Sequence, residues 1–269
     1  MDIRNNDQII WAPEEAAVLT AGVEVKKDQI EVEIVGWGNE KKSWSVDYRV
    51  LGDPADEDVW KQLDDALLTP YEHESGVPLQ AVTTCIGGGE KHFDKICVFA
   101  KKNKGRRIWT VKDVKESEGP VIGSPSLNNP LRVKVFPLRV DILKDMINKR
   151  LKIKEPAAEC MYFPVDRDEE FLKDTVKEKQ ESKVVRGKQT RIWVLKRPRN
   201  ESLNCRAYAL AAFYILNPDI KTILKGLTIS GKRIEAQYKE ANKTPEQREM
   251  ERYQEIHRRN GRMKDIFGS

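Results

Sequence analysis

Three strand-like segments in succession, followed by alternating helix-like and strand-like segments, constrain the fold of this chain most strongly. Residues 17–25 ("AVLTAGVEV"), 29–38 ("QIEVEIVGWG") and 42–52 ("KSWSVDYRVLG") are rich in β-branched residues and alternate in polarity. The turn-like sequence "KKDQ" joins the first two segments. We therefore expect an antiparallel meander of three strands.

The next segments predict a parallel crossover on the same sheet. Residues 53–71 begin with Asp and Pro and carry apolar residues at helical spacing. Residues 79–86 ("LQAVTTCI") form a nearly continuous apolar run, typical of a central buried strand, that stops at "GGGEK". Residues 92–103 predict a helix, and residues 106–114 predict another strand parallel to the first. This order predicts an α/β protein with an RNase H-like mixed sheet, in which the meander is extended by parallel strands and flanked by helices.

The second half of the chain predicts further elements of the same kind. In chain order they are a loop (123–130), a strand (131–140), a helix (141–153), a short strand (160–164), a helix that begins in the acidic cluster of 166–185, a hairpin arm (186–198) and an apolar helix (200–216). Asn200 is placed to cap the last of these helices.

The composition changes after residue 216. Residues 217–233 are mixed, and residues 243–261 predict a charged helix with Thr244 as its N-cap. This region is either a solvated tail or a docking element for a partner. We divide the chain into a lead-in or linker (1–17), an RNase H-like domain (18–216) and a basic, partly helical tail (217–269).

Composition excludes several classes of protein. The 269 residues are 39% hydrophobic and 34% charged, and no apolar run approaches the roughly 18 residues of a membrane-spanning helix. The opening sequence "MDIRNNDQIIWAPEE" has no secretory signal pattern, so we expect an intracellular protein. The 4 cysteines and 3 histidines are dispersed without any C-x-x-C pair, which favours free thiols over a zinc site.

Basic residues are concentrated in particular segments. The net charge is +5 and the pI is near 8.8, a mild excess that favours a nucleic-acid partner. Residues 101–107, 184–199 and the C-terminal tail carry most of the basic clusters. The second of these directly precedes the helix 200–216. We take its basic residues as candidate contacts to a DNA backbone: Arg186, Lys188, Arg191, Lys196, Arg197 and Arg199.

The predicted fold also marks three positions for chemistry. An RNase H-like nuclease holds carboxylates on its first strand, at the end of its central strand and on a later helix, where they bind two divalent cations. Mg²⁺ and Mn²⁺ prefer anionic oxygen ligands. In this chain the three positions are Glu24, Gly87 and Asn204.

At these positions the sequence resembles a specific family. The phrases "LTAGVEV", "EVEIVGWG", "SWSVDYRVLGDP", "FPVDRDEEF" and "RPRNESLNCRAYALAA" occur in one order over about residues 18–216. Together they are similar to the nuclease domain of the lambda-type phage terminase large subunit. The resemblance implies an endonuclease that cuts concatemeric phage DNA during packaging, encoded by a phage or prophage and acting in the cytoplasm of a bacterial host.

The resemblance also implies partners. Double-stranded DNA is the substrate, and an ATPase motor domain, the small terminase subunit and the portal are the protein partners to expect. A G-x-x-x-x-G-K-[ST] motif is absent from this sequence, because "GGGEK" has neither the spacing nor the Ser or Thr. We therefore expect the nuclease domain without its motor.

The departures from the family pattern affect the predicted metal ligands. Family members resemble "AGVDV", "CIDSGG" and "ALDC" where this chain has "AGVEV", "CIGGGE" and "SLNC". Only Glu24 remains acidic, so we expect two-metal cleavage to be impaired or lost, with Mg²⁺ or Mn²⁺ bound only if the site is active. The alternative is a pseudonuclease that acts as a DNA-binding or docking module.

Neighbouring residues offer further alternatives. Asp47 is a second candidate metal ligand beside Glu24, and Glu90 and Asp94 are further candidate carboxylates, although all three are also ordinary turn or surface residues. The glycines of "CIGGGEK" could cradle a phosphate with help from Lys91 and His92, or they could form a plain loop.

Overall fold

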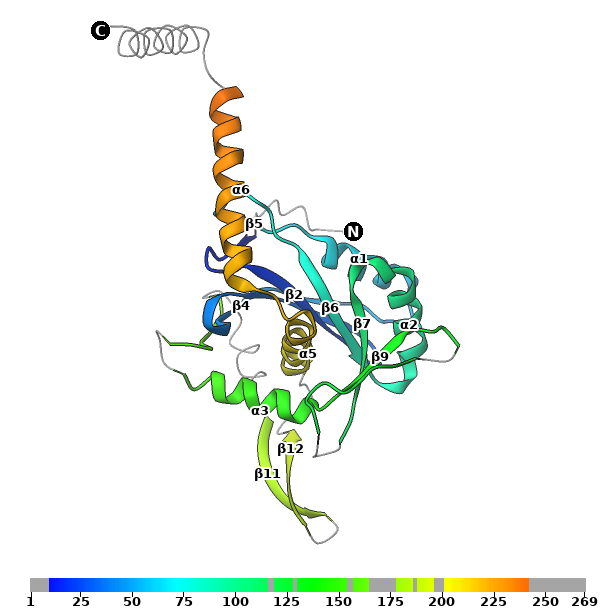
Figure 1. Ribbon diagram of the computed structural model, residues 1–269. Coiled ribbons are helices and arrows are strands. Elements are labelled where there is room, and N and C mark those ends of the chain that lie inside the picture. Colours follow the sequence, from blue (N-terminus) through cyan, green and yellow to red (C-terminus); the bar gives the residue numbers. More distant parts are fainter. Residues whose placement is uncertain are drawn as a thin grey trace, which may run out of the picture.

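An eight-stranded mixed sheet organises the computed structural model (Figure 1). The structure describes residues 10–115, 119–127, 130–153, 157–164, 178–185, 188–195 and 201–241. The strand order is β10-β4-β3-β2-β6-β7-β9-β8. The strands of this sheet are β2 (Val18–Val25), β3 (Ile30–Trp37), β4 (Ser43–Leu51), β6 (Ala81–Gly88), β7 (Ile108–Asp113), β8 (Ser126–Leu127), β9 (Lys134–Leu138) and β10 (Met161–Tyr162).

The direction of the strands confirms the predicted mixed sheet. β2, β3 and β4 pair antiparallel, as a meander does. β2 then pairs parallel with β6, β6 with β7, and β7 with β9. A β-bulge interrupts the pairing of β3 with β4, because Ile34 pairs with Asp47 whereas Val35 pairs with Ser45. This architecture is consistent with an RNase H-like fold.

Helices cover both faces of the sheet (Figure 1). Alternate residues of β2 point to opposite faces. Those that include Leu19 and Val23 pack in one core cluster with α1 (Glu57–Leu68) and α2 (Phe93–Lys102). The other face packs against α3 (Val140–Arg150) and α5 (Glu201–Leu216).

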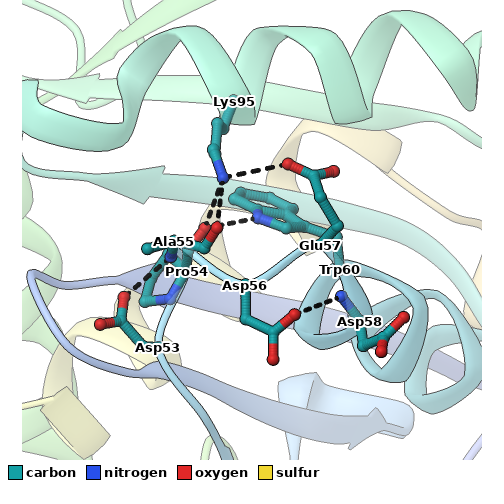
Figure 2. A network of polar contacts seen from close by, with 8 residues as sticks. All are labelled: Asp53, Pro54, Ala55, Asp56, Glu57, Asp58, Trp60 and Lys95. Carbon is teal, nitrogen blue, oxygen red and sulfur yellow. Dashed lines mark hydrogen bonds and ion pairs between the residues drawn. The ribbon is translucent and has the colours of Figure 1, made fainter.

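The start of α1 is fixed to α2 by a polar network (Figure 2). Asp56 caps α1 by accepting a hydrogen bond from the Asp58 backbone nitrogen at 2.9 Å. Lys95 of α2 donates to the carbonyl oxygens of Pro54 (3.0 Å) and Ala55 (2.9 Å). These contacts keep the two helices together on the face of the sheet opposite α5.

α5 lies directly on β2. A Cβ atom at Gly22 would come within 1.8 Å of the Cys205 carbonyl oxygen, so only glycine permits this approach. The Thr20 hydroxyl donates to the Ala209 carbonyl oxygen at 2.9 Å, and Trp37 stacks on Phe213 with ring centroids 4.6 Å apart. Because successive turns of α5 meet successively earlier residues of β2, the helix runs antiparallel to the strand.

Two segments differ from the sequence prediction. Glu178–Val185, which the acidic cluster assigned to a helix, forms strand β11 and pairs antiparallel with β12 (Lys188–Leu195). The backbone N–H and C=O groups of β11 pair with those of β12, and this cross-strand pairing is a contact that local helix propensity does not reveal. The hairpin arm itself is thereby confirmed over its described residues.

The mixed segment after residue 216 contains a long helix, α6 (Ile220–Ala241), which extends away from the sheet (Figure 1). Ile220, Ile223 and Leu227 recur at helical spacing and are partly buried. Gly226 and Gly231 have low helix propensity, so the sequence alone does not indicate a helix here. The charged helix predicted for residues 243–261 lies outside the described residues.

The N-terminal region is attached to the domain where it is described. β1 (Trp11–Ala12) pairs parallel with β5 (Glu72–His73), and Ala12, Ala16 and Ala17 are buried. Within the described ranges, none of the helices is both long and apolar enough to cross a membrane.

Candidate functional site

Glu24 lies near the carboxyl end of β2, on the face covered by α5. It pairs with Glu31 of β3 on one side and with Gly87 of β6 on the other. Its side chain is only 7% exposed. The carboxyl ends of parallel strands are where α/β folds usually form their sites.

Asn204 lies on the first turns of α5, close to this end of β2. The next residue, Cys205, donates a weak hydrogen bond to the Glu31 carbonyl oxygen, with a sulfur–oxygen distance of 3.3 Å. Glu31 is the direct cross-strand partner of Glu24. The structure therefore brings the predicted positions Glu24, Gly87 and Asn204 to one region between α5 and the sheet.

Gly87 contributes space that other side chains fill. A Cβ atom there would lie 2.8 Å from Val111 Cγ2 and 2.9 Å from the hydroxyl oxygen of Tyr208. Tyr208 is one helical turn after Asn204 on α5. A side chain at position 87 would require both neighbours to move.

Asp113 is a carboxylate at the site that sequence reasoning missed. It is the last residue of β7, the strand beside β6. The Tyr208 hydroxyl donates a hydrogen bond to Asp113 Oδ1 at 2.9 Å. The available signal was an acidic residue at the carboxyl end of a strand predicted to be parallel to the central strand.

Burial controls the ionisation of these carboxyl groups. Desolvation, followed by the charge of Asp113, raises the pKa of Glu24 to about 7, against smaller lowering effects that include Lys26 and Lys144. Desolvation also raises the pKa of Asp113, although the residue is exposed at the strand end. Glu24 is therefore partly neutral near physiological pH.

Asp47 does not join this group. The bulge between β3 and β4 places it opposite Ile34, on the face of α1 and α2. There it accepts hydrogen bonds from Tyr71 (2.9 Å) and from Arg49 Nε (2.7 Å). Glu24 faces α5 on the other side of the sheet, so the structure separates the two candidate ligands.

Close packing explains why one position of the glycine-rich turn after β6 requires glycine. A Cβ atom at Gly88 would come within 2.1 Å of the Val25 carbonyl oxygen. His92 Nε2 lies 3.2 Å from the Lys27 carbonyl oxygen, which joins this turn to the one after β2. Glu90 and Asp94 are both exposed on this turn and the first turn of α2.

The candidate DNA-binding residues lie on and around the hairpin arm. Lys188 and Arg191 are in β12, where they pair with Val185 and Ser182 of β11. The remaining four lie outside the described residues: Arg186, Lys196, Arg197 and Arg199.

A buried ion pair holds α5 against β3 next to the site. The Arg206 guanidinium donates to Glu33 at 3.2 Å through Nε and 2.5 Å through a terminal nitrogen. Ser45 also donates to Glu33, at 2.8 Å. Both ionic side chains are almost fully buried. This network is a structural feature of the helix–sheet interface.

The acidic groups present do not fit two divalent cations. Across the described ranges there is no group of three or more His, Cys, Asp or Glu residues that could hold a metal ion. On the α5 side of the sheet, Glu24 and Asp113 lie at the carboxyl ends of β2 and β7. Glu31, the cross-strand partner of Glu24, accepts hydrogen bonds from Gln29 and Tyr48.

The fold and the site define the class of protein. The chain is an α/β protein consistent with an RNase H-like fold, with an acidic residue on its first long strand facing a helix. The family model described as "Terminase large subunit gpA, endonuclease domain" matches residues 3–223, and the chain belongs to this family.

Curated relatives support this assignment. The chain is 29% identical over 213 residues to the "Terminase, large subunit" of Escherichia phage lambda, with 76% of this chain and 33% of the relative covered. It is 27% identical over 216 residues to the "Terminase, large subunit" of Enterobacteria phage P21, with the same coverage. The matched region thus spans about a third of these relatives. No solved structure matches the chain.

Proposed function

We propose that the chain acts as the endonuclease domain of a phage DNA-packaging terminase large subunit that binds double-stranded DNA but cuts it weakly or not at all. It acts in the cytoplasm of a bacterial host and is encoded by a phage or prophage. Membership of the gpA endonuclease family supports the packaging role. An ATPase motor domain, the small terminase subunit and the portal are the partners to test.

The main support for weak or absent cleavage is the small number of negatively charged metal ligands at the three predicted positions. Two-metal hydrolysis needs carboxylates that hold one cation to activate water and another to stabilise the leaving oxygen. Gly87 offers no ligand, and Asn204 offers an uncharged carbonyl oxygen. Glu24 is the one acidic side chain among these three positions.

A plasmid-nicking assay with Mg²⁺ or Mn²⁺ tests this proposal. The matched variant carries Glu24→Asp, Gly87→Asp and Asn204→Asp. Circular dichroism checks that this variant still folds, because a side chain at position 87 meets Val111 and Tyr208. We expect little nicking by the unmodified chain and more by the restored variant. Robust cleavage by the unmodified chain that Glu24→Ala abolishes would contradict the proposal.

DNA binding is tested separately through its dependence on salt. We expect Lys188→Ala with Arg191→Ala to weaken binding of duplex DNA and to reduce the slope of log affinity against log salt, because phosphate contacts release counterions. Lys101→Ala with Lys102→Ala, on exposed positions of α2, is the matched control. Fluorescence anisotropy at several salt concentrations gives both quantities. If the two double variants weakened binding equally, the hairpin arm would have no special part in DNA binding.

A docking role is the alternative function, and α6 supports it. Ile229 is 54% exposed and Ile234 is 44% exposed on the helix that extends from the domain. Burial of these two apolar side chains by a partner would be favourable. Sedimentation of the full chain with a purified motor domain, small subunit or portal tests this role, and Ile229→Glu with Ile234→Glu should abolish any complex. Unchanged complex formation by this variant would exclude the exposed isoleucines of α6 as the docking surface.

A further inference from the structure

A groove of about 960 Å³ runs between α6 and the turn after β5, and Figure 1 shows these two elements beside each other. Leu224, Leu227 and Ile234 contribute apolar side chains from α6. The stretch of α6 that lines the groove, from Leu224 to Glu235, is about 16 Å long at about 1.5 Å per residue. This length corresponds to about three turns of a second helix.

Hydrogen bonds among neighbouring residues fix the wall opposite α6. His73 is buried, and its Nδ1 lies 2.7 Å from Ser75 Oγ. Its Nε2 lies 3.1 Å from the Glu14 carbonyl oxygen, which joins the lead-in to the turn. On the other wall, Gly231 lets α6 approach the Ser75 carbonyl oxygen, where a Cβ atom would come within 2.0 Å. Because both walls are held in place before a partner binds, little entropy is lost in forming the groove.

The charged side chains of the groove are mainly acidic. Among the described residues, four glutamates and two lysines line it: Glu14, Glu15, Glu74, Glu235, Lys42 and Lys232. Lys42 and Glu15 form an ion pair at 3.5 Å. Glu14 and Glu74 are exposed, and neither is in an ion pair with another described residue. This charge repels the phosphates of DNA and attracts a basic partner.

We propose that the groove binds an amphipathic helix of a protein partner, with apolar residues at i, i+3, i+4 and i+7 and with Lys or Arg on its flanks. The apolar face of this helix packs on Leu224 and Leu227, and its basic flank faces Glu14 and Glu74. The inference goes beyond the proposed function, because none of the described residues that line the groove belongs to α5 or to strands β2, β6 and β7.

A fluorescein-labelled peptide of about 16 residues, with leucines on one helical face and lysines on its flanks, tests the proposal by fluorescence anisotropy with the full chain. We expect Glu14→Lys with Glu74→Lys to weaken binding by about tenfold, because two attractive contacts become repulsive. Asp65→Lys with Glu90→Lys is the matched control, since it makes the same change in net charge at exposed positions outside the groove. This control should change the affinity much less.

Two further variants test the groove by its shape. Thr228→Trp places a large side chain on an exposed position that lines the groove, and it should abolish binding of the lysine peptide. Ile229→Trp, at the next position of α6 but outside the described lining, should leave binding unchanged.

A charge swap gives a gain of affinity that a misfolded variant cannot imitate. The same peptide with glutamates in place of its lysines should bind the Glu14→Lys, Glu74→Lys variant about tenfold more tightly than it binds the unmodified chain. Equal affinity of the glutamate peptide for both proteins would contradict the proposed charge contacts.

Other occupants of the groove give different results. A second copy of the chain would appear in sedimentation velocity as self-association that Thr228→Trp abolishes. A nucleic acid would appear as binding of duplex DNA that Thr228→Trp weakens. Either result would overturn the inference, as would failure of the unmodified chain to bind the lysine peptide. None of these measurements depends on cleavage of DNA by the chain.

Discussion

Glu24 combines a buried position with a pKa of about 7, compared with 4.5 for an ordinary glutamate. In the folded protein it therefore holds a proton over a pH range where it has lost it in the unfolded chain. The folded state binds more protons between about pH 4.5 and 7, so stability falls as pH rises through this window. This is the opposite of the usual behaviour of a salt-bridged carboxylate.

Replacement of Glu24 by glutamine tests this behaviour. Glu24→Gln keeps the shape of the side chain but removes its titration, so we expect the variant to be more stable than the parent at pH 8 by on the order of 2 kcal/mol. The difference should shrink towards pH 5, where the parent is neutral. Urea unfolding at both pH values, with EDTA present to exclude metal binding, measures it. Equal stabilities at pH 8 would show that Glu24 is not desolvated.

At the scale of single elements, α6 contains two glycines in different surroundings. A Cβ atom at Gly226 meets nothing within 4 Å, whereas one at Gly231 would come within 2.0 Å of the Ser75 carbonyl oxygen. Gly231 therefore permits the close approach of α6 to the turn after β5, and Gly226 has no such role.

The two glycines predict opposite effects of the same substitution. Gly226→Ala should stabilise the protein by about 0.5–1 kcal/mol, because alanine loses less backbone entropy in a helix. Gly231→Ala should destabilise it by about 1–3 kcal/mol, because the methyl group must displace the turn. Thermal unfolding of both variants provides the comparison. A stabilising Gly231→Ala would mean that α6 does not pack against Ser75.

The elements that sequence predicted well are those with a clear period. The alternation in β2, β3 and β4 and the apolar run of β6 specify strands whose pairing follows from short connections. β11 was missed because its charged residues suit a helix, and only the pairing with β12 selects a strand. At the candidate site, the sequence pattern placed Glu24, Gly87 and Asn204 in one region, and their role stays a prediction. Asp113 reaches this region because β7 pairs with β6, and its contact with Tyr208, 95 residues away in sequence, could not be read from a local pattern.

At the scale of the whole molecule, the Arg206–Glu33 ion pair joins the helical layer to the sheet. Both side chains are almost fully buried, so either charge alone would be left without compensation. Ser45 and the Phe163 ring, 5.1 Å from the guanidinium carbon of Arg206, complete the surroundings of the pair. The position of α5, and with it of Asn204 and Tyr208, depends on this contact.

A double-mutant cycle measures this dependence. Arg206→Met and Glu33→Gln should each destabilise the protein by about 3–5 kcal/mol, because each leaves a buried charge unpaired. The double variant should recover a large part of this loss, since neither charge remains. Chemical unfolding of the four proteins gives the coupling energy. Additive losses would indicate that the two residues act independently.

The bulge opposite Ile34 and Val35 also limits what a change in the length of β4 can do. Val46 is the extra residue, because Ser45 pairs with Val35 and Asp47 pairs with Ile34. A single-codon deletion of Val46 would therefore leave a regular ladder in which Ser45 and Asp47 keep their present partners and faces. Loss of one residue at this point of the strand leaves Asp47 on the face of α1 and α2, so the acidic residues that face α5 stay the same.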